Sequence, residues 1–233
     1  MTDSSVITYQ GGAAGDMFAS GANGIAIDLQ QHEYIRRAPY TIKPLESDIM
    51  SGKLDLVCVI NELPYKFVTT HIYDSWKLLK FPTISIVVTD PDVIELIILR
   101  QMKLQKLTLK VAPNETFYRL IKTFVQKKDW IGAAKTWFAM AHKKWLIDQQ
   151  HRVNNALSNA LILNFNKLFC DDFVHSIEQQ RFTENLDVIK KNHNIWLMRN
   201  GSDTLESTLE SMAKKIQKMD WSLQHGSVSY DQP

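Results

Sequence analysis

The sequence predicts an α/β fold with a mainly parallel sheet, and three observations support this class. Short apolar runs rich in β-branched residues alternate with longer segments that carry apolar residues at helical spacing. Residues 83–89 are apolar on both faces of an extended chain, as expected of a strand buried in the middle of a parallel sheet. Residues 6–22 run from an apolar strand-like stretch through a glycine-rich turn straight into a helical segment, as at a β–α junction.

The candidate elements follow one another in an order that suits a single α/β domain. Strands are predicted at residues 6–10, 54–60, 67–71, 83–89 and 160–165. Helices are predicted at residues 16–22, 90–106, 114–159 with a break near 128–129, 171–192 and 202–219, followed by a short polar tail from about residue 222. Asp90 is a suitable N-cap for the second of these helices, and Pro91 suits its first helical position.

Composition excludes several classes of protein. A chain of 233 residues with 45% hydrophobic and 22% charged residues can bury one core and is not of the disordered type. The two cysteines, Cys58 and Cys170, lack C-x-x-C spacing, which argues against a disulfide framework or a zinc site. The N-terminus lacks a signal-peptide pattern, and no apolar run approaches the length of a membrane span. We therefore expect a single cytoplasmic domain, residues 1–233, with no membrane partner.

The net charge of +2 conceals an uneven distribution. Residues 100–152 contain 12 Lys and Arg against 3 Asp and Glu, whereas the rest of the chain contains 15 basic and 22 acidic residues. Aromatic residues are interleaved, and Trp130, Trp137 and Trp145 fall close to one helix face, which suggests a core role. The lysines lack the intervening acids of an ordinary solvated face, so we expect some of them to contact phosphate on a nucleotide or on nucleic acid.

The glycine-rich turn is a candidate anion-binding site. In such a junction the backbone amides of the turn and of the first helical turn point toward one spot, where the helix dipole favours negative charge. The residues that would present these amides are Gly11, Gly12, Ala13, Ala14, Gly15 and Met17. The turn holds no lysine, and Asp16 places a carboxylate close to the expected anion, where it would serve a metal ion or a hydroxyl group. A tight turn without any ligand is the alternative.

A histidine, His71, ends the strand predicted at residues 67–71. Parallel strands bring their carboxyl ends to one edge of the sheet, where ligands bind. His71 could act there as a general base or as an anion contact, with Asp74 or Asp16 orienting its ring. A purely structural histidine is equally compatible with the pattern.

Two carboxylates follow the central predicted strand at the same edge. Asp90 and Asp92 could hold a magnesium ion, or could accept a proton from a substrate. As caps of the following helix they need no such role, and the capping role is favoured for Asp90.

The order of these pieces resembles the sulfotransferase-like branch of the P-loop superfamily. That family has a short phosphate loop, a Lys-Thr-His element, an Arg-Asn-Pro-x-Asp element and a late strand that ends in Tyr-Glu-Asp-Leu. The counterparts in this chain are residues 10–18, 69–71, 89–92 and 161–168. The resemblance implies a P-loop-type three-layer fold with a mainly parallel sheet, in which the basic helical segment of residues 114–159 is an insertion.

The chain departs from that family at the residues that grip the nucleotide of the sulfuryl donor. Ala13 stands at the loop lysine, Thr89 at the arginine before Asn-Pro, and Ile97 and Ile98 at the serine of the following helix. Phosphoryl transfer on the same scaffold is therefore favoured, because positioning, a cation and a metal are its chief requirements. The missing positive charge would come from another residue, for example Lys77, Arg100 or Lys103.

The size and the unusual loop are also similar to P-loop kinases of large tailed bacteriophages, among them 5-hydroxymethyluracil DNA kinases. This resemblance implies phosphoryl transfer from ATP or another nucleoside triphosphate to a hydroxyl group of a nucleotide or modified DNA base, with Mg²⁺. Asp16, His71 and Asp90 would be catalytic, Arg100 and Lys103 would bind phosphate, and the basic segment would bind DNA in the host cytoplasm. Two alternatives stay open: a sulfotransferase-like enzyme, and a non-catalytic nucleic-acid-binding or phage–host interaction protein on a decayed P-loop scaffold.

Overall fold

The computed structural model describes residues 4–11, 15–27, 38–104, 115–156, 160–164, 183–200, 204–219 and 221. The chain forms two compact units. The first unit comprises Met1–Ile94 and Ile147–Ser202, and the second comprises Glu95–Leu146 and Asp203–Pro233. Two helices, α4 (Pro91–Leu104) and α6 (Trp130–Asn154), carry the chain from one unit to the other.

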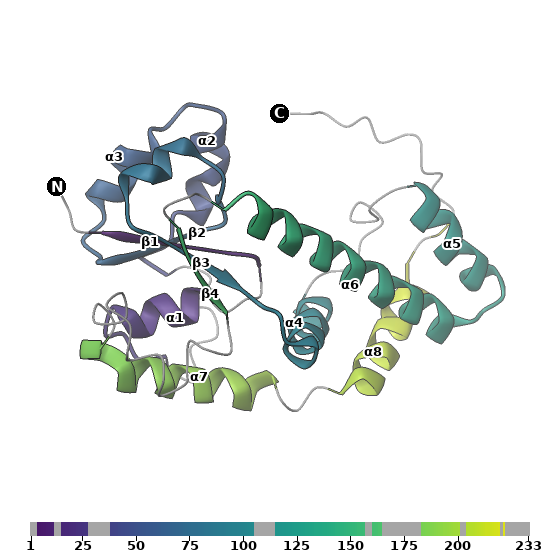
Figure 1. Cartoon of the computed structure of the whole chain (residues 1–233). Coiled ribbons are helices and arrows are strands. Elements are labelled where there is room, and N and C mark those ends of the chain that lie inside the picture. Colours follow the sequence, from purple (N-terminus) through teal and green to yellow (C-terminus); the bar gives the residue numbers. More distant parts are fainter. Residues whose placement is uncertain are drawn as a thin grey trace. The chain divides into compact units, whose positions relative to one another are not determined.

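The first unit is built on a sheet of parallel strands, so the predicted α/β class is confirmed. The four strands found in the described residues are β1 (Ser5–Tyr9), β2 (Phe67–Thr70), β3 (Thr83–Val87) and β4 (Ala160–Asn164), in the order β2-β1-β3-β4 (Figure 1). Every residue of β1, β2 and β3 is buried. Runs that are apolar on both faces suit strands in a sheet covered on both sides.

Helices cover both faces of this sheet, which is compatible with the expected three-layer arrangement. The helices on one face are α1 (Gly15–Ala22) and α7 (Leu186–Asn200), and those on the other are α2 (Glu46–Met50) and α3 (Leu56–Glu62) (Figure 1). A Cβ atom at Gly21 of α1 would come within 2.6 Å of the Ile189 backbone in α7. The absence of a side chain at Gly21 therefore allows α1 and α7 to pack closely.

Residues 54–60, predicted as a strand, instead lead into helix α3. Asp55 caps this helix, because its Oδ1 accepts hydrogen bonds from the backbone amides two and three residues further on, at 2.9 and 3.1 Å. Leu56 and Ile60 are fully buried in the apolar core, whereas Cys58 between them is exposed. A good N-cap and apolar residues at helical spacing thus outweigh the strand propensity of the β-branched run.

The long helical segment predicted at residues 114–159 is confirmed as two helices with a break at the expected place. They are α5 (Glu115–Gln126) and α6. Lys128 lies in the break with a φ of 56°, and Asp129 accepts a hydrogen bond from the amide of Gly132 at 2.8 Å. The turn therefore ends one helix with a left-handed residue and begins the next with a side-chain cap.

Three of the other predicted helices are confirmed, and the fourth differs in its bounds because α7 runs on to Asn200. α1, α4 and α8 (Leu205–Gln217) match their predictions to within a few residues. The predicted 171–192 helix falls partly outside the described residues, because 171–182 are not among them. Its described part contains a short 3₁₀ helix, Thr183–Asn185, before α7 begins.

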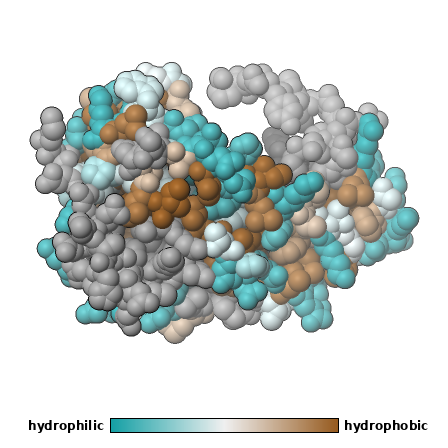
Figure 2. All heavy atoms as spheres, in the orientation of Figure 1, coloured by the Kyte–Doolittle hydropathy of each residue, from teal (hydrophilic) through white to brown (hydrophobic). Residues whose placement is uncertain are grey.

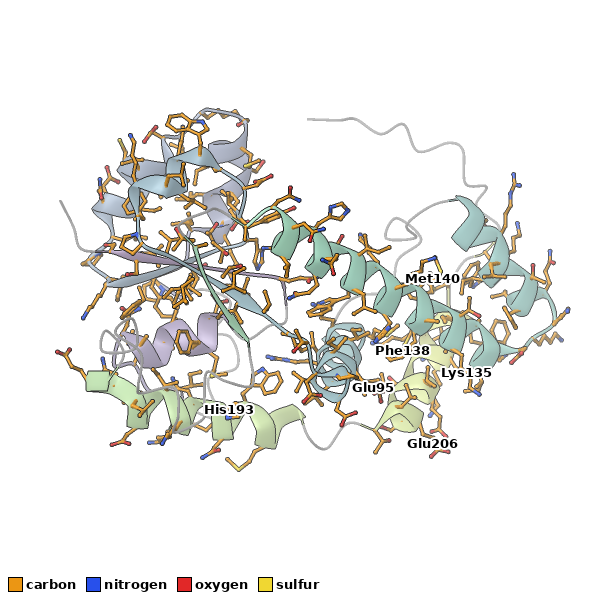
Figure 3. All side chains as sticks on the ribbon, in the orientation of Figure 1. Glu95, Lys135, Phe138, Met140, His193 and Glu206 are labelled. Atoms are coloured by element: carbon orange, nitrogen blue, oxygen red, sulfur yellow. The ribbon has the colours of Figure 1, made fainter. Side chains whose placement is uncertain are left out.

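The second unit is helical and carries much of the positive charge. Trp137 and Trp145 are buried, which confirms their predicted core role, whereas Trp130 is only half-buried. The Tyr118 ring stacks on Trp221 with ring centroids 5.8 Å apart. Exposed lysines lie on α6 and on the turn before it: Lys127, Lys128, Lys135, Lys143 and Lys144. Figure 3 labels Lys135 on α6, and Figure 2 shows hydrophilic and hydrophobic residues interspersed over α5 and α6. Over the described ranges, none of the helices has both the length and the apolar character needed to cross a bilayer.

Candidate functional site

The strand order β2-β1-β3-β4 creates a topological switch point at the carboxyl edge of the sheet, between β1 and β3. β1 lies between β2 and β3, so the chain first leaves β1 toward β2 and later crosses back to β3 on the other side. In open parallel sheets, ligands bind outside the carboxyl ends of two strands whose connections leave in opposite directions. The glycine-rich turn follows β1 and Asp90 follows β3, so both flank this position.

Asp16, in the first turn of α1, is the centre of a buried polar cluster. Its side chain is 10% exposed and its Oδ2 is paired with the ammonium group of Lys43. Oδ1 accepts a hydrogen bond from the Thr69 hydroxyl at 2.8 Å. The Lys43 ammonium also donates to the hydroxyl oxygen of Tyr9 at 2.9 Å. A buried charge pair is tolerated when its remaining polar atoms are hydrogen-bonded, and this pair meets that condition.

Lys43 is brought to the cluster by the residues that precede it. Thr41 forms an isolated parallel bridge with Thr69, and the amide and carbonyl of Thr69 each bond to this segment at 3.0 Å. A turn at residues 38–41 therefore brings residues 40–42 beside β2, where the bridge holds them. A short 3₁₀ helix, Lys43–Leu45, then begins, with Pro44 at its second position. The lysine thus reaches Asp16 from a part of the chain 27 residues away.

Tyr9, the last residue of β1, lies on the side of the glycine-rich turn. A Cβ atom at Gly15 would lie 2.1 Å from the Tyr9 ring, so only glycine fits at the start of α1. Burial raises the pKa of Tyr9 well above its ordinary value, and the Asp16 carboxylate raises it further. The Tyr9 hydroxyl therefore stays protonated and can serve the cluster only as a neutral group.

A second carboxylate, Glu46 at the start of α2, faces His71. Its Oε1 accepts hydrogen bonds from the Thr70 hydroxyl at 2.8 Å and from the backbone amide of His71. Its Oε2 lies 3.7 Å from the His71 Nδ1. The His71 ring also packs edge-on against Tyr9, with the ring centroids 5.1 Å apart. Glu46 is thus a carboxylate within ion-pair distance of the imidazole, and it also bonds the backbone amide of the same histidine.

The surroundings of His71 favour its neutral form. Burial lowers the pKa of His71; the Glu46 carboxylate opposes this effect, and the charges of Lys43 and Arg152 reinforce it. Arg152, near the end of α6, donates from Nη2 to the carbonyl oxygen of His71 at 3.0 Å. Its guanidinium group lies 4.5 Å from the centroid of the Tyr73 ring. A neutral imidazole at this position can accept a proton or a hydrogen bond.

The predicted phosphate-binding loop is described only in part. Gly11 lies in the turn after β1, and Gly15 and Met17 lie in the first turn of α1, where the Met17 side chain is buried in the core. Gly12, Ala13 and Ala14 lie outside the described residues. Asp16 and His71, both predicted as catalytic, come together through Tyr9 and Lys43.

The remaining predicted site residues lie on α4 or just before it. The Asp90 Oδ1 accepts a hydrogen bond from the amide of Asp92 at 2.9 Å, so Asp90 caps α4 as favoured from the sequence. Asp92 is exposed in the first turn. Arg100 and Lys103 lie on the part of α4 that belongs to the second unit.

Sequence reasoning missed two residues of the cluster, Lys43 and Glu46. Neither belongs to a motif, and both lie within residues 31–53, a polar, proline-punctuated stretch with no catalytic pattern. Lys77, named from the sequence as one possible source of the missing charge, instead pairs with Asp55 at 3.2 Å.

The acids after β3 are of the right chemical type for magnesium. Mg²⁺ takes oxygen ligands and is often held by one or two carboxylates together with substrate phosphates. Asp90 and Asp92 offer two carboxylates beside the switch point of the sheet, with one Asp90 oxygen engaged in capping. In the part of the chain that the structure describes, no three His, Cys, Asp or Glu side chains are grouped as a metal site by themselves.

Comparisons of the chain with protein-family models, with curated proteins and with solved structures find no match. The chemistry available at the site is therefore inferred from the side chains of the cluster. It combines a cation (Lys43), an acceptor of protons (Asp16) and a neutral imidazole (His71) at one edge of a parallel sheet.

Proposed function

We propose that the first unit is a P-loop-type phosphotransferase. It transfers a phosphoryl group from ATP or another nucleoside triphosphate to a hydroxyl group of a nucleotide or modified DNA base, such as 5-hydroxymethyluracil. The observation that carries this proposal is the buried Asp16–Lys43 pair, which lies beside the glycine-rich turn after β1. A cation for the phosphate and a base for the hydroxyl group are the side chains that such a transfer requires.

Lys43 takes the place of the lysine that the glycine-rich turn lacks. In the ligand-free chain its ammonium group is neutralised by Asp16 and bonded to Tyr9. A nucleotide phosphate bound at the start of α1 offers stronger negative charge, so the ammonium group moves from Asp16 to the phosphate oxygens. Backbone amides of the turn and of the first turn of α1 share the binding of that phosphate.

Release of Lys43 frees the Asp16 carboxylate for the acceptor. The acceptor oxygen attacks the γ-phosphorus, the new O–P bond forms as the bond to the bridging oxygen breaks, and the nucleoside diphosphate leaves. The hydroxyl proton passes to the Asp16 carboxylate, while Thr69 keeps the other carboxylate oxygen in position. His71, held by Glu46, accepts a hydrogen bond from the acceptor or donates one to it.

Asp90 and Asp92 would hold the magnesium ion of the nucleotide. The ion would supply charge neutralisation on the phosphates.

The proposal is tested with a labelled donor. We expect ATP labelled at the γ-phosphate to label an oligonucleotide that contains 5-hydroxymethyluracil and not the matched oligonucleotide with thymine. Asp16→Asn should lower the rate by about 100-fold or more, since a positioned base contributes about that much. Lys53→Met, at an exposed lysine paired with Asp48, is the control and should keep full activity. Absence of label with every nucleotide donor, or full activity in Asp16→Asn, would contradict the proposal.

A sulfotransferase-like enzyme is the rival that uses the same cluster, because a sulfuryl group also needs a cation and a base. ATP and the 3′-phosphoadenosine nucleotide separate the two, since a ligand that binds the folded state raises its melting temperature. We expect a rise with ATP. A rise with the 3′-phosphoadenosine nucleotide alone would favour sulfuryl transfer.

Nucleic-acid binding without catalysis is the second candidate, and the exposed lysines of the second unit favour it. They lie on α6 and on the turn before it, with Asp129 and Asp148 as the acids in the same stretch. A surface of this kind binds phosphate backbones in a salt-dependent way. It would bring DNA to the catalytic unit if the first proposal holds, and would be the whole function if no donor is used.

A further inference from the structure

The last two turns of α6 are anchored beside the candidate site. They belong to the first unit, which includes the chain from Ile147 onward. Arg152 is tied to the carbonyl oxygen of His71 by its Nη2 and covers the ring of Tyr73. This end of α6 is therefore fixed to the carboxyl end of β2, next to the histidine of the cluster.

Two neighbouring side chains on this helix end bury polar atoms that have no hydrogen-bond partner in the described part of the chain. Gln149 is 6% exposed, and neither its Nε2 nor its Oε1 has a hydrogen-bond partner among the described residues. The same holds for Nη1 of Arg152. The two residues are three apart and therefore lie on one face of the helix. Buried polar groups are nearly always bonded, and each one left unbonded costs about 1–3 kcal/mol.

The next residue along the chain shows that this arrangement is specific to one helix face. Gln150 is exposed, and its Nε2 donates a hydrogen bond to the Asn154 Oδ1 at 2.8 Å. Two adjacent glutamines of the same helix thus differ in burial and in bonding. Gln150 is hydrogen-bonded on the surface, whereas Gln149 is buried and neither end of its amide is bonded to a described residue.

The open atoms define the chemistry of what could satisfy them. Nη1 of Arg152 and Nε2 of Gln149 donate, and Oε1 of Gln149 accepts. The phosphodiester backbone of DNA offers acceptors only, so it would leave the Oε1 atom unbonded. The edge of a nucleobase offers a donor beside acceptors, and glutamine and arginine are the side chains that pair with base edges in two-bonded fashion.

We propose that Gln149 and Arg152 are the residues that recognise the acceptor, by binding the polar edge of its nucleobase beside His71. The inference rests on the proposed function in taking the acceptor to be a nucleotide or a DNA base. It adds the side chains that select this acceptor, on an element that belongs to neither the glycine-rich turn nor the Asp16 cluster.

The test compares binding of two single-stranded oligonucleotides, one with a 5-hydroxymethyluracil and one with an abasic site at the same position. We expect the wild-type chain to prefer the base-containing strand. Gln149→Leu should lose about tenfold or more of that preference, the value of one good two-bonded base contact, and leave the affinity for the abasic strand unchanged. Gln150→Leu is the matched control and should keep the preference.

A second readout separates recognition from a structural role. Gln149→Leu removes two unbonded buried atoms at similar volume, so we expect its melting temperature to equal or exceed that of the wild type. Arg152→Lys should reduce the base preference while ATP still raises the melting temperature. Equal binding of the two strands by the wild type, or an unchanged preference in Gln149→Leu, overturns the inference. Base preference without any labelled product would instead remove the proposed transfer and leave the recognition site in place.

Discussion

The two units of this chain place their charges in opposite ways. In the first unit a few charged side chains are buried at the carboxyl edge of a sheet, and each is held by named partners, as Asp16 is by Lys43 and Thr69. In the second unit many lysines stand exposed along α6 and the turn before it. The first arrangement costs desolvation and therefore fixes geometry, whereas the second costs little and leaves the side chains free to follow a polyanion.

The buried cluster and the exposed lysines also differ in how readily the sequence reveals them. A count of charges along the sequence locates the lysines of the second unit at once. The same count says nothing of the buried cluster, because its members come from four separate stretches of chain. Buried side chains with fixed partners suit chemistry that needs one geometry, and exposed lysines suit attraction that needs only charge.

The largest expected effect is on the buried pair. Lys43→Met leaves the Asp16 carboxylate buried without its cation, and we expect the free energy of unfolding to fall by about 3–5 kcal/mol. The double variant Asp16→Asn/Lys43→Met should recover much of that loss, because no buried charge is left unpaired. Urea unfolding of the two single variants and the double variant measures the coupling. Simple additivity of the single effects would mean that the two charges do not interact.

The next largest effect is expected on the stability of helix α3, residues 56–62. Leu56→Ala should cost about 2–5 kcal/mol, because the side chain is fully buried in the core of the first unit. Cys58→Ala is the matched variant and should change stability little, since this side chain is exposed. A strand would place both residues on one face. The native thiol should also react with an uncharged thiol reagent at the rate of an exposed cysteine, and slow labelling would argue for the strand.

DNA binding by the exposed lysines should depend on the salt concentration and not on the DNA sequence. Lys143→Gln/Lys144→Gln is expected to weaken DNA binding a few-fold at low salt, equally for every sequence. It should also reduce the slope of log K against log salt by up to about one for each lysine. Lys53→Gln, on the first unit, serves as the control. Fluorescence anisotropy over a range of salt concentrations measures the slope, and an unchanged slope would place the DNA contact elsewhere.

The smallest effect concerns acid stability in the first unit. His193 of α7 (Figure 3) stacks near Trp196, and burial lowers its pKa from the ordinary 6.5 to about 4. Between these values the unfolded chain binds a proton that the folded chain does not, so stability is complete above pH 6.5 and falls toward pH 4. His193→Gln should flatten that fall in part, because the lowered pKa of His71 acts in the same direction.

Melting temperatures between pH 4 and 7.5 provide the measurement. His151→Gln, at an exposed histidine of α6, should follow the wild-type curve. A His193→Gln curve as steep as that of the wild type would show that burial of this imidazole does not contribute to the acid loss.

Local sequence signals predicted those parts of the structure that depend on local causes. β3 was predicted because a β-branched apolar run suits a buried strand, and α4 because Asp90 and Pro91 begin a helix. The strand predicted at residues 54–60 was wrong, because burial of Leu56 and Ile60 at helical spacing outweighed the strand propensity of this segment. Asp16 and His71 were predicted from their places after strands.

The other half of the site could not be predicted, because it depends on long-range pairing. Lys43 reaches Asp16 because Thr41 pairs with Thr69 of β2, and no periodicity in the sequence predicts such a bridge. Gln149 and Gln150 are the same residue type at adjacent positions, and only the folded chain distinguishes the buried one from the exposed one.

The central claim is that Lys43 supplies the cation that the glycine-rich turn lacks. Titration calorimetry with ATP and Mg²⁺ tests it most directly, on the wild type, the double variant Asp16→Asn/Lys43→Met and the control Lys53→Met. We predict that the wild type and the control bind ATP alike and that the double variant loses at least tenfold in affinity, since the phosphate loses a charge-assisted contact. Equal ATP affinity in all three chains would contradict the claim.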